Sequence, residues 1–407
     1  MAENHNDSTI SRRNFFWGLW HGAFLALGMA LTQPTTVIAA FVAELTGSTL
    51  WVGGLSTVLA IAQALPQLIV ARWIEPYPYK MPFLKLAIYL RVVSWAMLSW
   101  MVAAWGVRRP DLVAYALVGL LALFFFGGGI GGVPYMVVIG KVIPPWRRGS
   151  FFAGRQILAA PLAIGGAFLA RHILASEPYP RSYALLFGLA AVGLSVASLG
   201  FWAIREPADA AGVQRKTWRS YLRDLRKALR HLRVLVVVQV LTGFSLMALP
   251  FYVVFARQEL GAPTAAVGTF LVAQVAGGIL GNLVWARLVD RFGAWSMLAR
   301  CALLSAFVPL LAIGLSPAGW QGLLPVVFLA GATVNGREVG FPSALLELAP
   351  AEARSTYSAL NTMLSLPIAF LPLIAGVLLN RIPYALVFLV AAMFIGAGAL
   401  VARTQAK

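Results

Sequence analysis

The sequence predicts an all-α integral membrane protein in which twelve transmembrane helices form two pseudo-symmetric six-helix bundles. Composition is the first indication, because 60% of the 407 residues are hydrophobic and only 11% are charged. Soluble domains are usually about 45–50% apolar and about 25% charged. The other two indications are a set of twelve long apolar segments and an internal repeat.

Each apolar segment is long enough to cross about 30 Å of hydrocarbon at about 1.5 Å per residue. The segments lack the alternating pattern of a membrane barrel, so helices are the expected form. The first half supplies Phe15–Val42, Val52–Ala71, Leu84–Trp105, Leu112–Val138, Phe152–Leu174 and Tyr183–Ile204. The second half supplies Leu232–Ala256, Ala265–Ala286, Ser296–Leu315, Leu323–Leu345, Tyr357–Leu379 and Tyr384–Ala402.

A basic stretch separates the two halves, with nine Lys or Arg and three acidic residues between Arg205 and Arg233. From Trp218 to Leu232 its apolar residues recur every three or four positions, which predicts an amphipathic helix lying on the membrane surface. A flexible basic linker is the alternative. The predicted organisation is an N-terminal bundle at 1–204, a cytosolic linker at 205–231 and a C-terminal bundle at 232–407.

The net charge of +18 sits mainly between the apolar segments, where basic residues report topology. With the amino terminus inside, 25 Lys and Arg residues face the cytosol and 6 face outside. This asymmetry predicts a multi-pass protein of the cell (inner or plasma) membrane with both termini in the cytosol. It also argues against nucleic acid as a partner.

The two halves repeat each other in sequence. A shift of 215 residues places Glu75 on Asp290, and a shift of 206 residues places Arg148 on Arg354. Both halves therefore run in the same orientation, as expected for a parallel duplication of a six-helix unit.

Two parallel six-helix halves joined by a basic linker resemble the major facilitator superfamily over the whole chain. Residues 286–293 (Ala-Arg-Leu-Val-Asp-Arg-Phe-Gly) are similar to the superfamily's loop signature between helices 8 and 9. The first-half copy around Glu75 keeps an acid but lacks the Asp-Arg-x-Gly pattern. Residues 144–149 resemble a common superfamily turn between helices 4 and 5. The resemblance implies a secondary transporter.

The loop signature, its first-half copy at Glu75 and the repeated arginines Arg148 and Arg354 are candidate gating residues. An acid at a cytosolic helix end can hold donors of a neighbouring helix in one conformation and release them in another. The candidates are Asp290, Arg291, Gly293, Glu75, Arg148 and Arg354. A topology signal combined with a helix cap is the alternative.

Polar residues within the apolar segments are candidates for a substrate cavity. Such groups beside a proline at membrane depth line a cavity or satisfy freed backbone groups. Helices 1, 4, 7 and 10 line the central cavity in the resembled superfamily, which implies substrate contacts at Gln33, Tyr135, Gln239 and Asn335. His21 is a further candidate, as a proton relay. Hydrogen bonding between helices is the alternative for each residue.

Arg337 and Glu338 are the most informative pair. If helix 10 stopped before them, its apolar run of 14 residues would be too short to cross the bilayer. Both charges therefore lie within the span, where a charge costs about 2.5–3.5 kcal/mol even on the insertion scale. We expect Glu338 to carry a coupling proton and Arg337 to tune it or to bind an anionic substrate group. A static ion pair is the alternative.

Two further motifs carry less weight. Residues 127–132 (Gly-Gly-Gly-Ile-Gly-Gly) contain a formal G-x-G-x-x-G, but this run lies within an apolar segment and fits close helix packing better than nucleotide binding. Residues 160–166 loosely resemble the antiporter signature of exporters, with a spacing one residue too long. A proline kink is the alternative.

The expected function is secondary active transport of a small solute by alternating access, with proton coupling and a slight preference for efflux. A lipid or lysolipid transporter or flippase of the same fold is an alternative. A membrane-embedded enzyme is disfavoured because the histidines (His5, His21, His172 and His231) are scattered. The single Cys301 excludes CxxC sites, so no cofactor or metal is expected. The expected partners are the solute, the bilayer and H⁺, and we expect a monomer.

Overall fold

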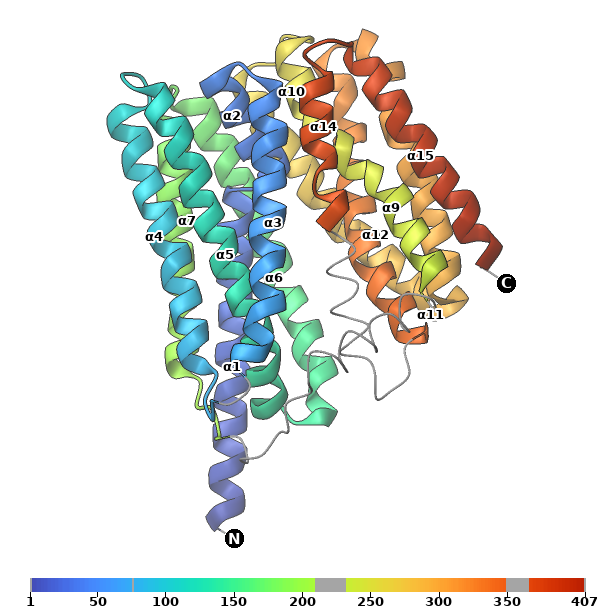
Figure 1. Cartoon of the computed structure of the whole chain (residues 1–407). Coiled ribbons are helices and arrows are strands. Elements are labelled where there is room, and N and C mark those ends of the chain that lie inside the picture. The colour runs from blue at the N-terminus through green and yellow to red at the C-terminus, as the bar shows by residue number, and fades with distance from the viewer. Residues whose placement is uncertain (1, 75–76, 209–231, 349–365, 406–407) are drawn as a thin grey trace. The chain divides into compact units, whose positions relative to one another are not determined.

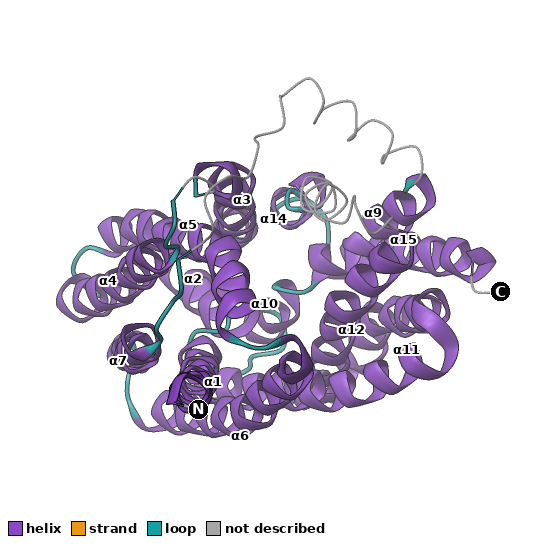
Figure 2. Cartoon of the chain, turned by 90° about the horizontal axis from the view of Figure 1, so that it is seen from below, coloured by secondary structure: helices purple, strands orange, loops and turns teal. Residues whose placement is uncertain are grey.

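The computed structural model describes residues 2–74, 77–208, 232–348 and 366–405 (Figure 1). Every element in these ranges is a helix, as the colouring of Figure 2 shows. Nine segments of this described part are long and apolar enough to cross a membrane. The prediction of an all-α membrane fold is therefore confirmed, while the count of twelve helices stays a prediction.

The chain falls into two compact units. The first holds residues 1–33 and 58–214, and the second holds residues 34–57 and 215–407. The end of the first predicted helix and the start of the second therefore pack with the C-terminal half. The bundles predicted at 1–204 and 232–407 follow the repeat and stay predictions. Most of the linker, with its predicted amphipathic helix, lies outside the described residues.

In its described residues, the first unit is built from five long helices and the part of a sixth, α3, that starts at Val58. These are α1 (Ala2–Leu31), α3 (Thr49–Trp73), α4 (Met81–Trp105), α5 (Pro110–Val142), α6 (Arg148–Ser176) and α7 (Arg181–Ala203), with a short turn η2 (Pro145–Arg147) before α6. α4 contacts α5 and α7 and runs beside them in Figure 1, while α1 contacts α6 and α7. Trp95, Phe124 and Phe187 are fully buried between these helices.

In its described residues, the second unit holds seven complete helices and three short turns. The helices are α2 (Ala39–Thr46), α9 (Arg233–Ala248), α10 (Phe251–Gln258), α11 (Thr264–Leu315), α12 (Leu324–Leu348), α14 (Leu371–Leu378) and α15 (Tyr384–Gln405). The turns are η1 (Pro34–Ile38), η3 (Ser316–Ala318) and η4 (Trp320–Leu323). α11 contacts α12 and α15, and α9 contacts α14 and α15. Leu235, Leu298 and Phe341 belong to the buried core that these helices share.

Gly293 divides α11 into two helices. Its φ of 79° lies in the left-handed region that glycine adopts without steric cost. The first part of α11 runs up to this residue, beyond the end predicted at Ala286, and the second part starts at Ala294. Asp290 and Arg291 are therefore helical and do not lie in a loop. The reason is that one glycine supplies the whole change of direction, so no longer connection is needed.

Helix 1 is interrupted where the sequence places its polar stretch. α1 ends at Leu31, and the chain continues after Gln33 as a π-helix, η1. Pro34 has no N–H to donate, and its ring disfavours a helical conformation in the residue before it. The Thr32 hydroxyl donates to the Gly28 carbonyl at 3.0 Å. π-helical segments are rare and often occur at functional sites.

The glycine run of residues 127–132 packs α5 against its neighbours. A side chain at Gly129 would press on the backbone carbonyl of Gln63 in α3, and one at Gly127 would meet the Ala87 carbonyl of α4. Small residues allow such close approach of membrane helices. The run is helical throughout, which supports packing and not a nucleotide loop.

Candidate functional site

His21 and Tyr135 lie together in the first unit. Their ring centroids are 6.1 Å apart, and His21 also stacks on Phe201 with centroids at 3.9 Å. His21 Nδ1 lies 3.1 Å from the Ala197 carbonyl oxygen, which can only accept, so Nδ1 carries a proton and donates it to this bond. The Tyr135 hydroxyl is buried and has no hydrogen-bond partner among the described residues.

Two of the 25 basic residues that the topology count places on the cytosolic side, Arg91 and Arg155, also belong here. The Arg155 guanidinium lies over the Tyr135 ring, 5.2 Å from its centroid. The Arg91 guanidinium lies over the Phe124 ring at 4.4 Å. Arg155 comes early in the predicted span Phe152–Leu174, and Arg91 lies inside Leu84–Trp105. The signal that identified Arg337, a charge within an apolar span, would have identified both.

Arg337 lies inside the second unit and contacts α9. Its guanidinium donates to the Thr242 hydroxyl and, at 3.5 Å, to the backbone carbonyl of Gln239. It also lies over the Phe341 ring, 4.9 Å from the centroid. The partners of Arg337 among the described residues are therefore neutral. A static ion pair, the alternative considered for this residue, is not the arrangement that these contacts form.

Glu338 points elsewhere, as expected for adjacent helical residues. Its side chain is exposed on the surface of α12 and makes no hydrogen bond or ion pair within the described part of the chain. Three residues earlier, Asn335 lies where its amide would meet any side chain placed at Gly278 of α11. Gln239 is buried in α9, and Gln33 lies at the break of helix 1, in the first unit. The substrate candidates are therefore distributed over both units.

The predicted gating residues are only partly described. Asp290 and Arg291 are exposed, and Asp290 has no hydrogen bond or ion pair within the described ranges. The N–H of Ala294, the first after Gly293, donates at 3.0 Å to the Glu347 carboxylate of α12. Glu347, which the sequence analysis missed, thus caps the part of α11 that starts at Ala294.

Arg148 caps the end of α5. Its guanidinium donates to the Ile143 carbonyl at 3.2 Å and to the Gly140 carbonyl at 2.6 Å. Basic side chains near a helix carboxyl end stabilise these last carbonyl groups. Its repeat partner Arg354 and the first-half acid Glu75 lie outside the described residues. The gating roles of all six candidates stay predictions.

A buried carboxylate missed by the sequence analysis joins three elements of the first unit. Glu206, just after α7, accepts hydrogen bonds from the backbone N–H groups of Lys80 at 2.8 Å and Met81 at 2.7 Å, at the start of α4. It also pairs with the Lys141 ammonium of α5 at 2.7 Å. An anion at a helix amino end is favoured by the free N–H groups and the helix dipole there.

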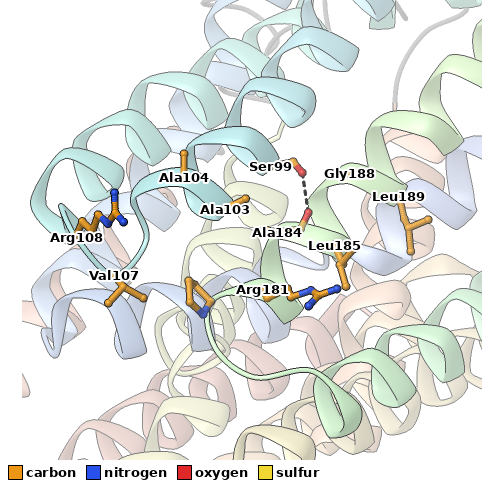
Figure 3. A pocket seen from close by; sticks show the side chains of 11 residues that line it. Ser99, Ala103, Ala104, Val107, Arg108, Arg181, Ala184, Leu185, Gly188 and Leu189 are labelled. Atoms are coloured by element: carbon orange, nitrogen blue, oxygen red, sulfur yellow. Dashed lines mark hydrogen bonds between the residues drawn. The ribbon is translucent and has the colours of Figure 1, made fainter.

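A separate hollow lies between α4 and α7 (Figure 3). Its volume is about 730 Å³, and its lining is mostly apolar but includes Arg108 and Arg181. None of the predicted site residues lines it. Within the described chain, no group of three His, Cys, Asp or Glu residues is placed to hold a metal ion.

Comparisons with known proteins agree with this architecture. Residues 235–405 match the sequence profile of the Major Facilitator Superfamily. A variant of the nucleoside transporter NupG is similar over 96% of this chain and 100% of its own, with a TM-score of 0.71 and 12% identity. A D-xylose–proton symporter is similar over 97% and 96%, with a TM-score of 0.67 and 13% identity.

A POT family transporter, solved with a thioalcohol-conjugated peptide, is similar over 97% of this chain and 95% of its own. Its TM-score is 0.72 and its identity 12%. No curated protein matches the sequence. At these identities the structural similarities establish the fold alone.

Fold and sequence profile together define a multi-pass membrane protein of the transporter class. The predicted resemblance to the major facilitator superfamily is confirmed, with the sequence pattern in the second half and the fold over nearly the whole chain.

Proposed function

We propose that the chain is a secondary active transporter of a small solute that works by alternating access and is driven by a proton gradient. Transport follows from the superfamily match and from charged side chains held within apolar spans. The similar structures include a nucleoside transporter, a sugar–proton symporter and a peptide-bound transporter, so these three solute classes belong in a first binding screen.

One observation carries the proton coupling. Glu338 is the only Asp or Glu in the twelve predicted spans, although the chain has fourteen acidic residues. A carboxylate is suited to gain and lose a proton during a cycle. No other acidic side chain is available within the spans. Glu338 is therefore the coupling residue in this proposal, with His21 as a relay and Arg337 as the cation that tunes the site.

Replacing Glu338 tests this role. In proteoliposomes loaded with a solute found by the binding screen, Glu338→Gln should abolish accumulation driven by a proton gradient and leave solute exchange intact. Glu347→Gln is the matched control on the same helix, since the amide oxygen can still accept from Ala294. Accumulation by Glu338→Gln that still depends on the proton gradient would mean that the proton is carried elsewhere.

Further parts of the proposal come from the sequence. The substrate contacts are Gln33, Tyr135, Gln239, Asn335 and Arg337, and the preferred direction is efflux. The protein works as a monomer in the cell membrane with both termini in the cytosol. Asp290 and the other five gating candidates act at the gate.

A lipid or lysolipid transporter is the second candidate. The apolar hollow between α4 and α7, with Arg108 and Arg181 in its lining, favours it because an acyl chain and a phosphate need these two environments. Transfer of fluorescent lysolipid across proteoliposomes, without uptake of any soluble solute, would select this alternative.

A further inference from the structure

Arg91 lies deep in the first unit and is poorly satisfied. It comes ten residues after Met81, the first residue of α4, which is about 15 Å along the helix axis. Its only hydrogen bond to a described residue goes to the Met29 sulfur at 3.4 Å, and its buried Nε has no partner. Gly127 of α5 leaves room for its stem, since a side chain there would press on the Arg91 Cγ atom at 3.2 Å.

Arg155 is held in the same manner. It comes seven residues after Arg148, the start of α6, which is about 10 Å along that helix. Its stem lies against Gly22 of α1, where any side chain would overlap it. Apart from the Tyr135 ring, no described residue makes a hydrogen bond or ion pair with it. Each arginine thus rests against a glycine and over an aromatic ring.

Among the described residues, neither cation forms an ion pair with an acidic side chain. None of the six predicted spans of the first half contains an Asp or Glu. Met29, which Arg91 contacts, and Gly22, which the Arg155 stem contacts, both lie on α1 two helical turns apart, so the two arginines face the same side of that helix. A single arginine at the centre of a span costs about 2.5–3.5 kcal/mol on the insertion scale. Cation–π contacts offset part of this cost but leave the N–H donors without oxygen acceptors.

We propose that Arg155 and Arg91, together with the Tyr135 hydroxyl, bind the acidic group of the transported solute, which is an organic anion carrying a carboxylate or a phosphate. This rests on the proposed transport function and adds its substrate class. A guanidinium presents paired N–H donors that match both acidic groups. The free Tyr135 hydroxyl supplies a third donor beside Arg155.

A structural role for the arginines makes an opposite prediction. If they served only to hold helices together, replacing them would lower the stability of the empty protein. If they are kept for binding, the removal of an unneutralised charge from the span leaves the empty protein equally or more stable. Stability without ligand and stabilisation by ligand therefore separate the two roles.

The experiment is a thermal unfolding series on purified full-length protein in neutral detergent at constant ionic strength. Succinate is compared with succinamide, and glycerol 3-phosphate with glycerol, so that each pair differs in charge. The variants are Arg155→Gln and Arg91→Gln. Arg171→Gln is the control, since Arg171 lies on the same helix as Arg155 and is exposed.

We expect at least one anion to raise the unfolding temperature of the unmodified protein by about 2 °C or more, with no effect of its uncharged partner. Arg155→Gln and Arg91→Gln should lose this rise without unfolding at a lower temperature when empty. Arg171→Gln should keep it. A response to succinate alone assigns a carboxylate, and a response to glycerol 3-phosphate alone assigns a phosphate.

Three results would overturn the proposal: no stabilisation by either anion, equal stabilisation by an uncharged partner, or a rise that persists in both arginine variants. The assay uses no membrane gradient. An anion that binds to a protein that fails to transport would therefore refute the transport proposal and leave the anion site standing.

Discussion

Arg337 and Glu338 are adjacent in sequence but lie in different surroundings. Arg337 donates to Thr242 and to a backbone carbonyl inside the second unit, whereas Glu338 is exposed on α12. Arg91 and Arg155, in the first unit, make no hydrogen bond to an oxygen atom of the described residues. At the scale of single residues, the buried arginines therefore differ in whether the described part of their own unit supplies an oxygen acceptor.

Glu206 should be a large contributor to stability in the first unit. Its side chain and that of Lys141 are only 2% and 12% exposed, so Glu206→Gln breaks an ion pair that is nearly buried. Removing one partner of a buried pair costs about 3 kcal/mol or more. Glu177→Gln is the control, because the pair of Glu177 with Arg181 is far more exposed and is worth about 1 kcal/mol at most.

Thermal unfolding of the two variants measures the difference. Equal unfolding temperatures for Glu206→Gln and Glu177→Gln would show that the Glu206 contacts do not contribute as their burial indicates.

The sequence allowed only some of these residues to be found. Arg337 and Glu338 were predicted because the bilayer thickness forces them into a span. The same reasoning applies to Arg91, which lies inside the span Leu84–Trp105, although the topology count places it on the cytosolic side. Glu206 could not be predicted, since its partners lie 65 and 126 positions away and only tertiary packing brings them together.

The duplicated helices keep a cap but build it differently. A shift of 206 residues places Lys141 on Glu347. In the second unit, Glu347 directly caps the part of α11 that starts at Ala294. In the first unit, Lys141 pairs with Glu206, which caps the start of α4. The repeat thus preserves a carboxylate cap at the start of the corresponding helix, although the residue at the repeated position is basic in the first unit and acidic in the second.

Close helix contacts follow the same duplication. In the first unit, Gln63 of α3 lies over Gly128 of α5. In the second unit, Asn335 of α12 lies over Gly278 of α11, the repeat partner of Gln63. The side-chain amide therefore lies on the earlier helix of the pair (α3) in the first unit and on the later helix (α12) in the second, and the glycine lies on the other helix in each case. Sequence predicted that the glycines pack, but not which neighbour they face.

Gly277→Ala tests the contact between α11 and α12. A methyl group there would overlap the backbone carbonyl of Phe328, which cannot move without shifting α12. We expect destabilisation of about 1–3 kcal/mol or more. Gly314→Ala, in the part of α11 after Gly293, should change stability by no more than about 0.5 kcal/mol, because its side chain would meet no atom within 4 Å. Detergent-based unfolding compares them, and equal losses would contradict the contact.

At the scale of the whole chain, the sequence predicts the fold well and the substrate poorly. Every spanning segment must be apolar and satisfy its own backbone groups, so hydropathy and length alone reveal a helical membrane protein. Recognition of a solute depends on a few side chains that helices far apart in sequence bring together. Tyr135 and Arg155, two of the proposed contacts, show why, since only the fold places the guanidinium over the ring.

The second unit joins the start of the chain to its C-terminal half. Glu44 of α2 pairs with Arg257 of α10 at 3.0 Å, and the Thr49 hydroxyl contacts the Gly376 carbonyl at 3.0 Å and the Asn380 side chain at 3.1 Å. Under the predicted topology, these contacts lie toward the outer side. Alternating access requires that they separate during each cycle.

Cross-linking tests this requirement. Thr49→Cys combined with Asn380→Cys, with Cys301 replaced, should form a link under oxidation or with a short dithiol-reactive reagent. The link should block net transport in proteoliposomes, and reduction should restore it. Each single cysteine variant, treated identically, is the control and should transport normally. Full transport by the linked protein would mean that this contact stays closed throughout the cycle, so the alternating opening would have to occur elsewhere in the chain.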